Sequence, residues 1–226
     1  MKRIATVGAV LAVLTTLGAC SGEEPLPPVD GTVVQPGKPG EDSQVLDEAP
    51  RVETATANDA DIMFVQMMIP HHAQALEMAE LAPDAGGSKQ VRTLADRIQG
   101  AQRPEIVYMS GWLSDRELRV PTKQQIEDGT VPMDHAAHGD HHGSSMSTHD
   151  MEGMASEADM ARLADARGAA FDRLFLELMI DHHQGALAMV DEVVRDGSDQ
   201  QINELATGIS ADQTAEIQRM RTLLAG

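Results

Sequence analysis

The fold is decided by a stretch that occurs twice in the chain, as FVQMMIPHHAQALEM at residues 64–78 and as FLELMIDHHQGALAM at residues 175–189. The similarity extends further, because residues 61–113 align with residues 172–224 at a constant offset of 111 positions and without a gap. About 19 of these 53 aligned positions are identical. The chain therefore contains two copies of one structural unit, and a pseudo-twofold assembly of the copies is expected.

Each copy is predicted to form two helices joined by a short turn. In the first copy, apolar residues recur at helical spacing over residues 61–82 and again over residues 91–113. Residues 83–88 between them supply helix breakers and an N-capping serine, and residues 196–199 form the corresponding turn of the second copy. Two such hairpins can bury their apolar stripes against each other, which predicts an all-α, ferritin-like four-helix bundle.

Paired histidines interrupt the apolar stripe of each copy. Folding each hairpin about its turn brings a glutamine and a glutamate of the second helix level with the histidine pair. Such polar groups need partners in a core, because an unpaired buried group costs a few kcal/mol. One interpretation is a hydrogen-bond network that fixes the register of the bundle. The other is a metal site, since neutral imidazole suits copper, zinc, iron and nickel, and thioether sulfur selects Cu(I).

We interpret this polar layer as a metal site. The candidate metal ligands are His71, His72, Met68, Met78, His182, His183, Met179 and Met189. The residues expected to orient these ligands, or to bind metal themselves, are Gln102, Glu105, Gln213 and Glu216. Met109 and Met220 are assigned to the apolar core, because methionines at helical spacing are usually core residues.

Residues 114–157 separate the two copies and contain a second group of potential ligands. The segment is rich in Gly, Ser and Asp and lacks an apolar period, so its methionines are not expected to fill a core. A tract that mixes His and Met is typical of copper binding, and the alternative is a solvated polar linker. We expect a disordered linker that collects metal weakly. Its candidate ligands are Met133, His135, His138, His141, His142, Met146, His149, Met151 and Met154.

The N-terminus has the features of a bacterial export signal. Lys2 and Arg3 precede a short apolar run, and the signal is predicted to span residues 1–19. The following Leu17-Gly18-Ala19-Cys20 resembles a lipobox, which predicts that Cys20 is lipidated; the alternative is an ordinary secretory signal. The predicted organisation is a disordered Pro-rich and acidic tether at residues 20–56, and a bundle at residues 57–226 made of a first repeat (58–113), the linker (114–157) and a second repeat (158–226).

The composition excludes several classes of protein. With 36 acidic and 17 basic residues the chain carries a formal charge of −19, whereas nucleic-acid binding requires a basic patch. The single cysteine excludes a disulfide framework and a zinc site built from thiolates. No nucleophile motif, phosphate loop or acid pair at useful spacing is present, so hydrolytic chemistry and an organic cofactor are not expected.

Three motifs resemble those of the bacterial exported family named domain of unknown function 305. They occupy residues 67–72, 101–113 and 175–186. The resemblance covers about residues 59–224 and implies a ferritin-like four-helix bundle. Some members of the family are associated with periplasmic copper binding and copper resistance, so it also implies copper as the metal and the eight histidines and methionines above as the family-type ligand positions. Leu178 and Leu223 stand where the first repeat has Met67 and Trp112, so strict equivalence of the two halves is not expected.

The sequence thus leads to the hypothesis of a non-enzymatic, lipid-anchored copper-binding protein on the extracytoplasmic face of a bacterial membrane. It would buffer Cu(I) or Cu(II), confer tolerance to copper, or transfer the metal to a delivery partner in the cell envelope. A ferritin-like oxidase with Glu105 and Glu216 as metal ligands is an alternative, although the Glu-x-x-His motif of di-iron sites is missing. A third possibility is a metal-free module for interactions in the envelope.

Overall fold

The computed structural model of the chain describes residues 33–35, 42, 44–46, 56–85, 87–134, 144–148 and 151–226. It divides into two units, residues 1–52 and residues 53–226. In the first unit, β1 (Val33–Gln35) and β2 (Gln44–Leu46) pair antiparallel within the segment predicted to be a tether. The predicted signal peptide and Cys20 lie outside the described residues. No helix in the described part of the chain is long and apolar enough to cross a membrane.

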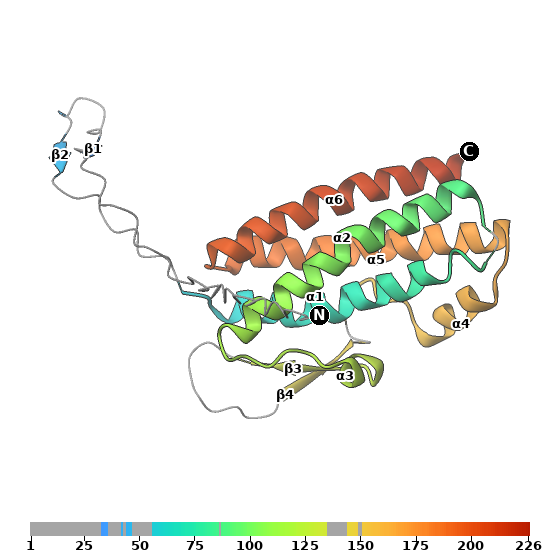
Figure 1. The fold of residues 1–226 in the computed structure, drawn as a ribbon, viewed down its shortest axis with the longest axis horizontal. Helices are drawn as coiled ribbons and strands as arrows, with labels where there is room; N and C mark the ends of the chain where they lie inside the picture. Colours follow the sequence, from blue (N-terminus) through green and yellow to red (C-terminus); the bar gives the residue numbers. More distant parts are fainter. Residues whose placement is uncertain are drawn as a thin grey trace, which may run out of the picture. The chain divides into compact units, whose positions relative to one another are not determined.

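Four long helices build the second unit. They are α1 (Asp59–Glu80), α2 (Lys89–Ser114), α5 (Ala169–Asp196) and α6 (Gln200–Ala225). Within each repeat the two helices pack against each other, and α1 also packs against α5, so that the first helices of the two repeats lie at the centre (Figure 1). The prediction of an all-α fold with one helical hairpin for each repeat is therefore confirmed.

Two aspartates at equivalent positions, Asp61 and Asp172, each fix the turn of the other repeat. The Asp61 carboxylate on α1 accepts hydrogen bonds from the backbone N–H groups of Ser198 and Asp199 at the start of α6, both at 3.0 Å. The Asp172 carboxylate on α5 accepts a bond of 2.8 Å from the backbone N–H of Ser88 at the start of α2. A carboxylate is favoured at a helix N-terminus because the first N–H groups have no partner within the helix. This exchange of caps ties the two hairpins together.

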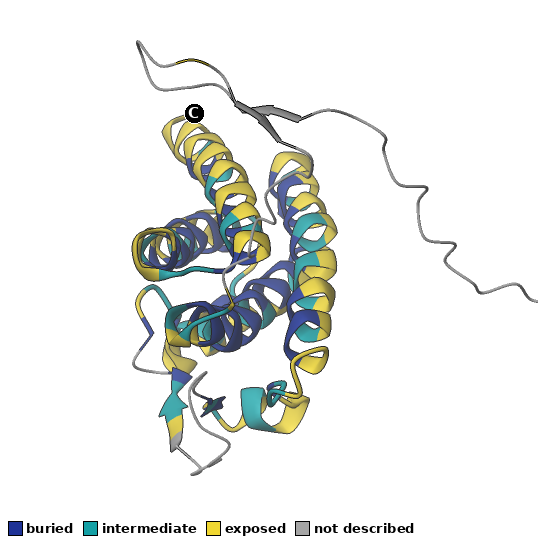
Figure 2. Cartoon of the chain, turned by 90° about the vertical axis from the view of Figure 1, so that its left-hand side faces the viewer, coloured by how far each residue is buried: buried dark blue, intermediate teal, exposed yellow. Residues whose placement is uncertain are grey.

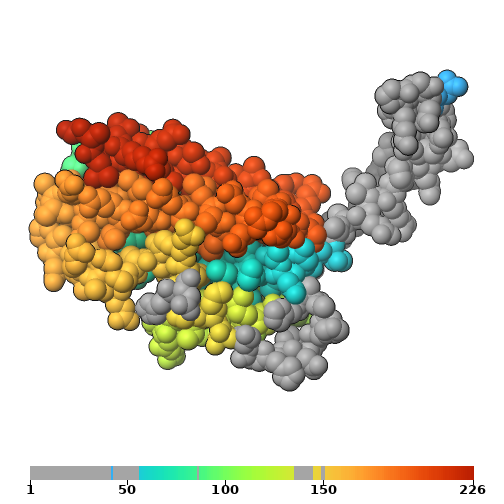
Figure 3. All heavy atoms as spheres, turned by 180° about the vertical axis from the view of Figure 1, so that it is seen from behind, coloured from blue at the N-terminus to red at the C-terminus, as the bar shows by residue number. Residues whose placement is uncertain are grey.

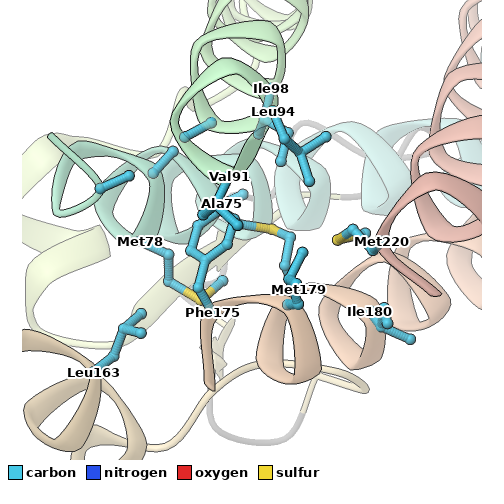
Figure 4. Close-up of a cluster of buried hydrophobic side chains, with 14 of the residues drawn as sticks. Ala75, Met78, Val91, Leu94, Ile98, Leu163, Phe175, Met179, Ile180 and Met220 are labelled. Atoms are coloured by element: carbon cyan, nitrogen blue, oxygen red, sulfur yellow. The ribbon is translucent and has the colours of Figure 1, made fainter. Parts of the chain in front are cut away.

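A layer of polar side chains divides the core into two apolar clusters. Buried residues face inward on all four long helices (Figure 2). Cluster 1 joins the end of α1, the start of α2, the first half of α5 and the end of α6. It contains Met78, Phe175, Met179 and Met220 (Figure 4). Cluster 2 joins the opposite ends of the same helices. Each fully buried side chain of this size stabilises the fold by about 1.5–3 kcal/mol, so the two clusters hold the polar layer between them.

The segment between the repeats is more ordered than the sequence predicts. It contains α3 (Lys123–Glu127), the antiparallel pair of β3 (Thr130–Met133) and β4 (Ser144–Ser147), and the start of α4 (Glu157–Asp165). Val131 is fully buried, and β3 packs on α1. The expectation of a disordered linker was therefore wrong for its described part. Its elements are too short to produce a recognisable apolar period, which is why the sequence pattern missed them.

A buried glutamine of α1 anchors this segment. The Gln66 side chain donates a hydrogen bond of 2.9 Å to the Asp134 carboxylate and accepts one of 2.9 Å from the Asp134 backbone N–H. Arg119 also donates to the Asp134 carboxylate, at 2.7 Å from its Nε atom. The chain is thus fixed to α1 directly before the first histidine of the predicted metal-collecting tract.

Candidate metal centre

The four paired histidines meet in the polar layer, and all four are completely buried. The rings of His71 on α1 and His182 on α5 lie with their centroids 3.8 Å apart. The centroids of His182 and His183 are 6.4 Å apart. The structure therefore brings together, at the α1–α5 contact, imidazoles that are 111 residues apart in sequence.

The second helix of each hairpin contributes a carboxylate to one histidine. His72 Nε2 lies 2.8 Å from Glu105 of α2, and His183 Nε2 lies 2.7 Å from Glu216 of α6. The two glutamate side chains are 18% and 16% exposed, so they stand between the buried layer and solvent. Folding each hairpin about its turn placed a glutamate in the layer of its histidine pair, level with Met68 and Met179, and the structure shows it in contact with the second histidine in both copies.

These contacts define which ring nitrogen carries the proton. A carboxylate or a backbone carbonyl oxygen can only accept a hydrogen bond, so the neutral imidazole must donate from the nitrogen that faces it. His72 and His183 therefore donate from Nε2 to the two glutamates. His71 donates from Nε2 to the backbone carbonyl of Glu152, at 3.3 Å. In all three rings the lone pair is then left on Nδ1.

Most of the remaining polar atoms of the layer lack a partner. Among the described residues, no atom in hydrogen-bond geometry faces the Nδ1 atoms of His71, His72 and His183 or either ring nitrogen of His182. The same holds for both side-chain polar atoms of Gln102 and for Oε1 of Gln213. Each such group costs about 1–3 kcal/mol if nothing satisfies it. Buried nitrogen lone pairs that lack a partner are potential donors to a metal ion.

Burial keeps His71, His182 and His183 uncharged. Burial, followed by repulsion from His72, lowers the pKa of His71 from 6.5 to about 3, although the Glu152 carbonyl opposes the shift. Burial, with repulsion from His71 and His183, holds the pKa of His182 well below its ordinary value. Burial also lowers the pKa of His183, against the opposing effect of Glu216. Neutral imidazole is the form that binds a metal, so no proton has to be removed at neutral pH.

The methionines divide evenly between the two sides of the layer. Cluster 2 contains Met68, Met109 and Met189, and cluster 1 contains Met78, Met179 and Met220. Five of the six are fully buried, and Met189 is 7% exposed. Each methionine of cluster 2 has its repeat equivalent in cluster 1; the equivalent pairs are Met68 and Met179, Met109 and Met220, and Met189 and Met78. The four methionines predicted as ligands therefore flank the histidines in pairs and do not form one group.

A preformed site of histidine and carboxylate ligands is not present in the part of the chain that the structure describes. There, no three residues of the types His, Cys, Asp and Glu are arranged so that they could hold one ion together. The donor atoms that remain are imidazole nitrogens and thioether sulfurs. This combination is the one that favours a soft ion such as Cu(I).

The predicted metal-collecting tract lies only partly within the described residues. His135, His138, His141, His142 and His149 fall outside them. Met133, Met146 and Met154 are half-buried, and Met151 is 5% exposed. The expectation that the linker methionines fill no core was wrong for Met151, a residue of the segment between β4 and α4 whose side chain is buried.

Sequence reasoning missed two residues beside the histidines. Gln74 of α1 forms two hydrogen bonds with the backbone of Ala155. Gly185 of α5 leaves room for the backbone of Glu152. The only available signal was that Gln74 and Gly185 occupy equivalent positions of the repeat and yet differ in type. A difference at one repeat position carries no information until the segment that contacts both residues is known.

A family model described as domain of unknown function (DUF305) matches residues 61–224. The chain belongs to the DUF305 family. The match spans both hairpins and the segment between them, so it includes every residue of the polar layer. No curated protein matches the chain.

Solved structures of two DUF305 proteins and of CopM share this fold. A protein from Streptomyces coelicolor that is described as predicted to be secreted has 29% identity and a TM-score of 0.60, over 74% of this chain and 93% of its own. A DUF305 fragment from Deinococcus radiodurans has 32% identity and a TM-score of 0.59, over 76% and 99%. CopM in its Cu(I)-bound form has 28% identity and a TM-score of 0.53, over 72% and 94%. CopM has also been solved with Cu(II) and with silver bound.

Proposed function

We propose that this DUF305 protein binds copper in the buried polar layer and serves to buffer copper, to confer tolerance to it, or to pass it on. The likeness to CopM, which has been solved with Cu(I) and Cu(II) bound, supports a copper-related role. At 28% identity this likeness does not identify ligands. The candidate ligands are therefore assigned from the contacts and burial of the polar layer.

The observation that carries the proposal is the group of unpartnered lone pairs. Three Nδ1 atoms, from His71, His72 and His183, are buried without a hydrogen-bond partner among the described residues. A bound metal would give these atoms a partner and remove a cost of about 1–3 kcal/mol for each. Neutral nitrogen and sulfur donors suit Cu(I) and its mimic Ag(I) better than they suit hard divalent ions.

Each residue of the layer has a role under this proposal. The Nδ1 atoms of no more than two histidines would hold one metal ion in this arrangement, with Met68 and Met189 available on one side and Met78 and Met179 on the other. Glu105 and Glu216 would orient His72 and His183 by accepting their Nε2 protons, which is the usual role of a carboxylate behind a metal-binding histidine. Gln102 and Gln213 contribute further polar atoms at the same level.

The cellular setting belongs to the same proposal. Export, removal of residues 1–19 and lipidation of Cys20 would hold the protein at the extracytoplasmic face of a membrane, with residues 20–56 as a spacer. The Streptomyces coelicolor relative, which is predicted to be secreted, supports an extracytoplasmic location. The histidines of residues 135–149 would collect metal weakly, and a delivery partner in the envelope would exchange it.

A role without catalysis fits the arrangement of the carboxylates. A ferritin-like oxidase would use Glu105 and Glu216 as metal ligands, but in this structure both accept a hydrogen bond from a histidine. This favours an orienting role over direct ligation. A metal-free interaction module would give no partner to the buried polar atoms of the layer.

The proposal is tested on mature protein purified without an affinity tag. Metal analysis and competition titration with a Cu(I) chelator would be compared for wild type and for H72Q/H183Q, which keeps polar side chains in the layer. We expect tight binding of Cu(I) by wild type and its loss in the double variant. Stoichiometric iron without copper would support the oxidase. No tightly bound metal in wild type would refute both metal-binding functions.

A further inference from the structure

A five-residue segment, residues 151–155, lies across the contact between α1 and α5, directly over the histidine layer. We call it the strap. It follows β4 and leads into α4, and the yellow atoms of this part of the chain lie between the orange α5 and the teal α1 in Figure 3. Met151 at its start is 5% exposed and anchors it in the core. The strap contacts both helices, and it does so in different ways.

Hydrogen bonds attach the strap to α1. Gln74 donates from Nε2 to the Ala155 carbonyl at 2.9 Å and accepts from the Ala155 backbone N–H at 2.8 Å. His71, one helical turn earlier, donates to the Glu152 carbonyl at 3.3 Å. The strap thus covers the one polar atom of His71 that has a partner, and this imidazole is completely buried beneath it.

Close approach of the backbone attaches the strap to α5. A Cβ atom on Gly185 would overlap the Glu152 carbonyl, so only glycine fits at this position of the helix. Gly153 has a positive φ of 81°, and a Cβ atom there would lie 2.6 Å from the Asp181 carbonyl oxygen. Two glycines therefore allow the strap to lie directly on the helix that carries His182.

The two attachment points are equivalent positions of the repeat. Gln74 and Gly185 are 111 residues apart, as are His71 and His182. Both copies of the repeat keep the histidine. Three residues later, the first copy has Gln74, which forms hydrogen bonds with the strap, and the second copy has Gly185, which leaves room for the strap backbone. The strap is a single segment that contacts both positions in different ways, so it requires different residue types at the two positions.

We propose that the strap is a removable cover that controls access to the histidine layer. Opening requires the loss of three hydrogen bonds to α1 and exposes the buried side chains of Met151 and Ala155. The rest of cluster 1 and all of cluster 2 stay packed, so opening is a local event and not global unfolding. The cover sets how fast a metal ion enters and leaves, and it leaves the affinity nearly unchanged. Entry past the partly exposed side chains of Glu105 or Glu216 is the competing route. The regulation of copper rests on the proposed function, whereas control of access to His71 does not.

The first experiment measures access in metal-free mature protein. Diethyl pyrocarbonate modifies accessible histidines, and mass spectrometry of peptides gives the rate at His71. The variant Q74A removes both bonds to Ala155. Q66A is the matched control. Gln66 lies on α1, as Gln74 does, and makes two equivalent hydrogen bonds to Asp134, but it does not contact the strap. Hydrogen exchange at Gly153–Ala155 reports whether the strap has loosened.

We expect modification of His71 to be about tenfold faster in Q74A, as for the loss of two hydrogen bonds that hold a closed state, and nearly unchanged in Q66A. G185A, in which the new Cβ atom displaces the strap from α5, should act in the same direction. Equal acceleration in Q74A and Q66A would mean general destabilisation and would overturn the proposal. So would an unchanged rate at His71, whether or not hydrogen exchange at the strap increases.

The second experiment follows Cu(I) in stopped flow. Loading, and removal by excess chelator, should both be faster in Q74A by a similar factor, with little change in the dissociation constant. Faster removal alone would mean that the strap contributes to binding and is not a cover. A wild-type protein that binds no Cu(I) in the layer would refute the proposed function, while the labelling of His71 would still decide whether the strap controls access.

Discussion

The imidazole rings of His71 and His182 lie with their centroids 3.8 Å apart, at an angle of 41° between the ring planes. The two residues occupy the same position of the two repeats, so equivalent positions of α1 and α5 meet at this contact. Two neutral imidazoles can approach this closely, whereas two imidazolium ions would repel each other. The centre of the molecule is therefore built for uncharged histidines.

The stability of the metal-free protein is expected to fall as the pH drops below about 6.5. The unfolded chain takes up protons on its histidines near this pH, whereas burial lowers the pKa of folded His71 to about 3 and also lowers those of His182 and His183. The unfolded state then binds more protons, which lowers the free energy of unfolding by about 1.4 kcal/mol per pH unit for each histidine. Urea unfolding at about pH 7.5, about pH 6.5 and about pH 5.5 measures the slope. The variant H71Q should have a shallower slope, and an identical slope would contradict this explanation.

Glu105 and Glu216 are expected to act through the histidines that they contact. E105A and E216A should each weaken Cu(I) binding by about 10–100-fold, as is typical when the partner of a metal-binding histidine is lost. In ¹⁵N-histidine NMR spectra of the metal-free protein, His72 and His183 should carry their proton on Nε2, and each variant should show a mixture of tautomers at its own histidine. E192A, on the exposed face of α5, is the control. Unchanged tautomers in E105A and E216A would argue against an orienting role.

The turn glycines are expected to be essential for the exchange of caps between the hairpins. A Cβ atom on Gly87 would overlap the Asp172 carboxylate, and one on Gly197 would overlap that of Asp61. G87A and G197A should therefore lower the free energy of unfolding by about 1–3 kcal/mol. Gly100 and Gly208 lie within helices, and a Cβ atom at either position would have no neighbour within 4 Å, so replacing either by Ala should stabilise the fold by about 0.5–1 kcal/mol. Urea unfolding measures the free energy of unfolding of all four variants. A change of the same sign in the turn variants and in the helix variants would refute this explanation.

The histidines between the repeats are expected to add weak copper binding without supporting the fold. Replacing His135, His138, His141 and His142 by Asn should reduce the number of weakly bound copper ions and leave the melting temperature unchanged. Removal of residues 135–154 should instead destabilise the protein, because it removes β4 and most of the strap. Metal titration and thermal unfolding of the two variants separate these effects. A marked loss of stability in the Asn variant would show that these histidines have structural partners.

The repeat made the helical part of the fold predictable. The constant spacing between the two copies located both hairpins, and folding each hairpin about its turn placed Glu105 and Glu216 in the same layer as the histidine pairs, without pairing them with individual histidines. These are contacts within a hairpin, where helical geometry alone sets which residues are level. The cap that Asp61 provides to Ser198 could not be predicted in this way, because it depends on how the two hairpins are placed against each other.

The strap shows why the rest of the site could not be predicted. Its contacts with His71 and Gln74 are made by backbone atoms of Glu152 and Ala155, and a backbone carbonyl leaves no signature in the residue type. Met151 is buried although its neighbours are polar and its segment has no apolar period. Short irregular segments of this kind are recognised only from the surface on which they pack.

The location of the metal is tested most directly by NMR of ¹⁵N-histidine protein in which His135, His138, His141 and His142 are replaced by Asn. Addition of an equimolar amount of Cu(I) under reducing conditions should shift the Nδ1 resonances of His71, His72 and His183 and leave their Nε2 atoms protonated. This result would place copper in the buried layer, on the nitrogens that lack a partner in the metal-free protein. If none of the resonances of these three residues changed on addition of Cu(I), the central claim would be contradicted.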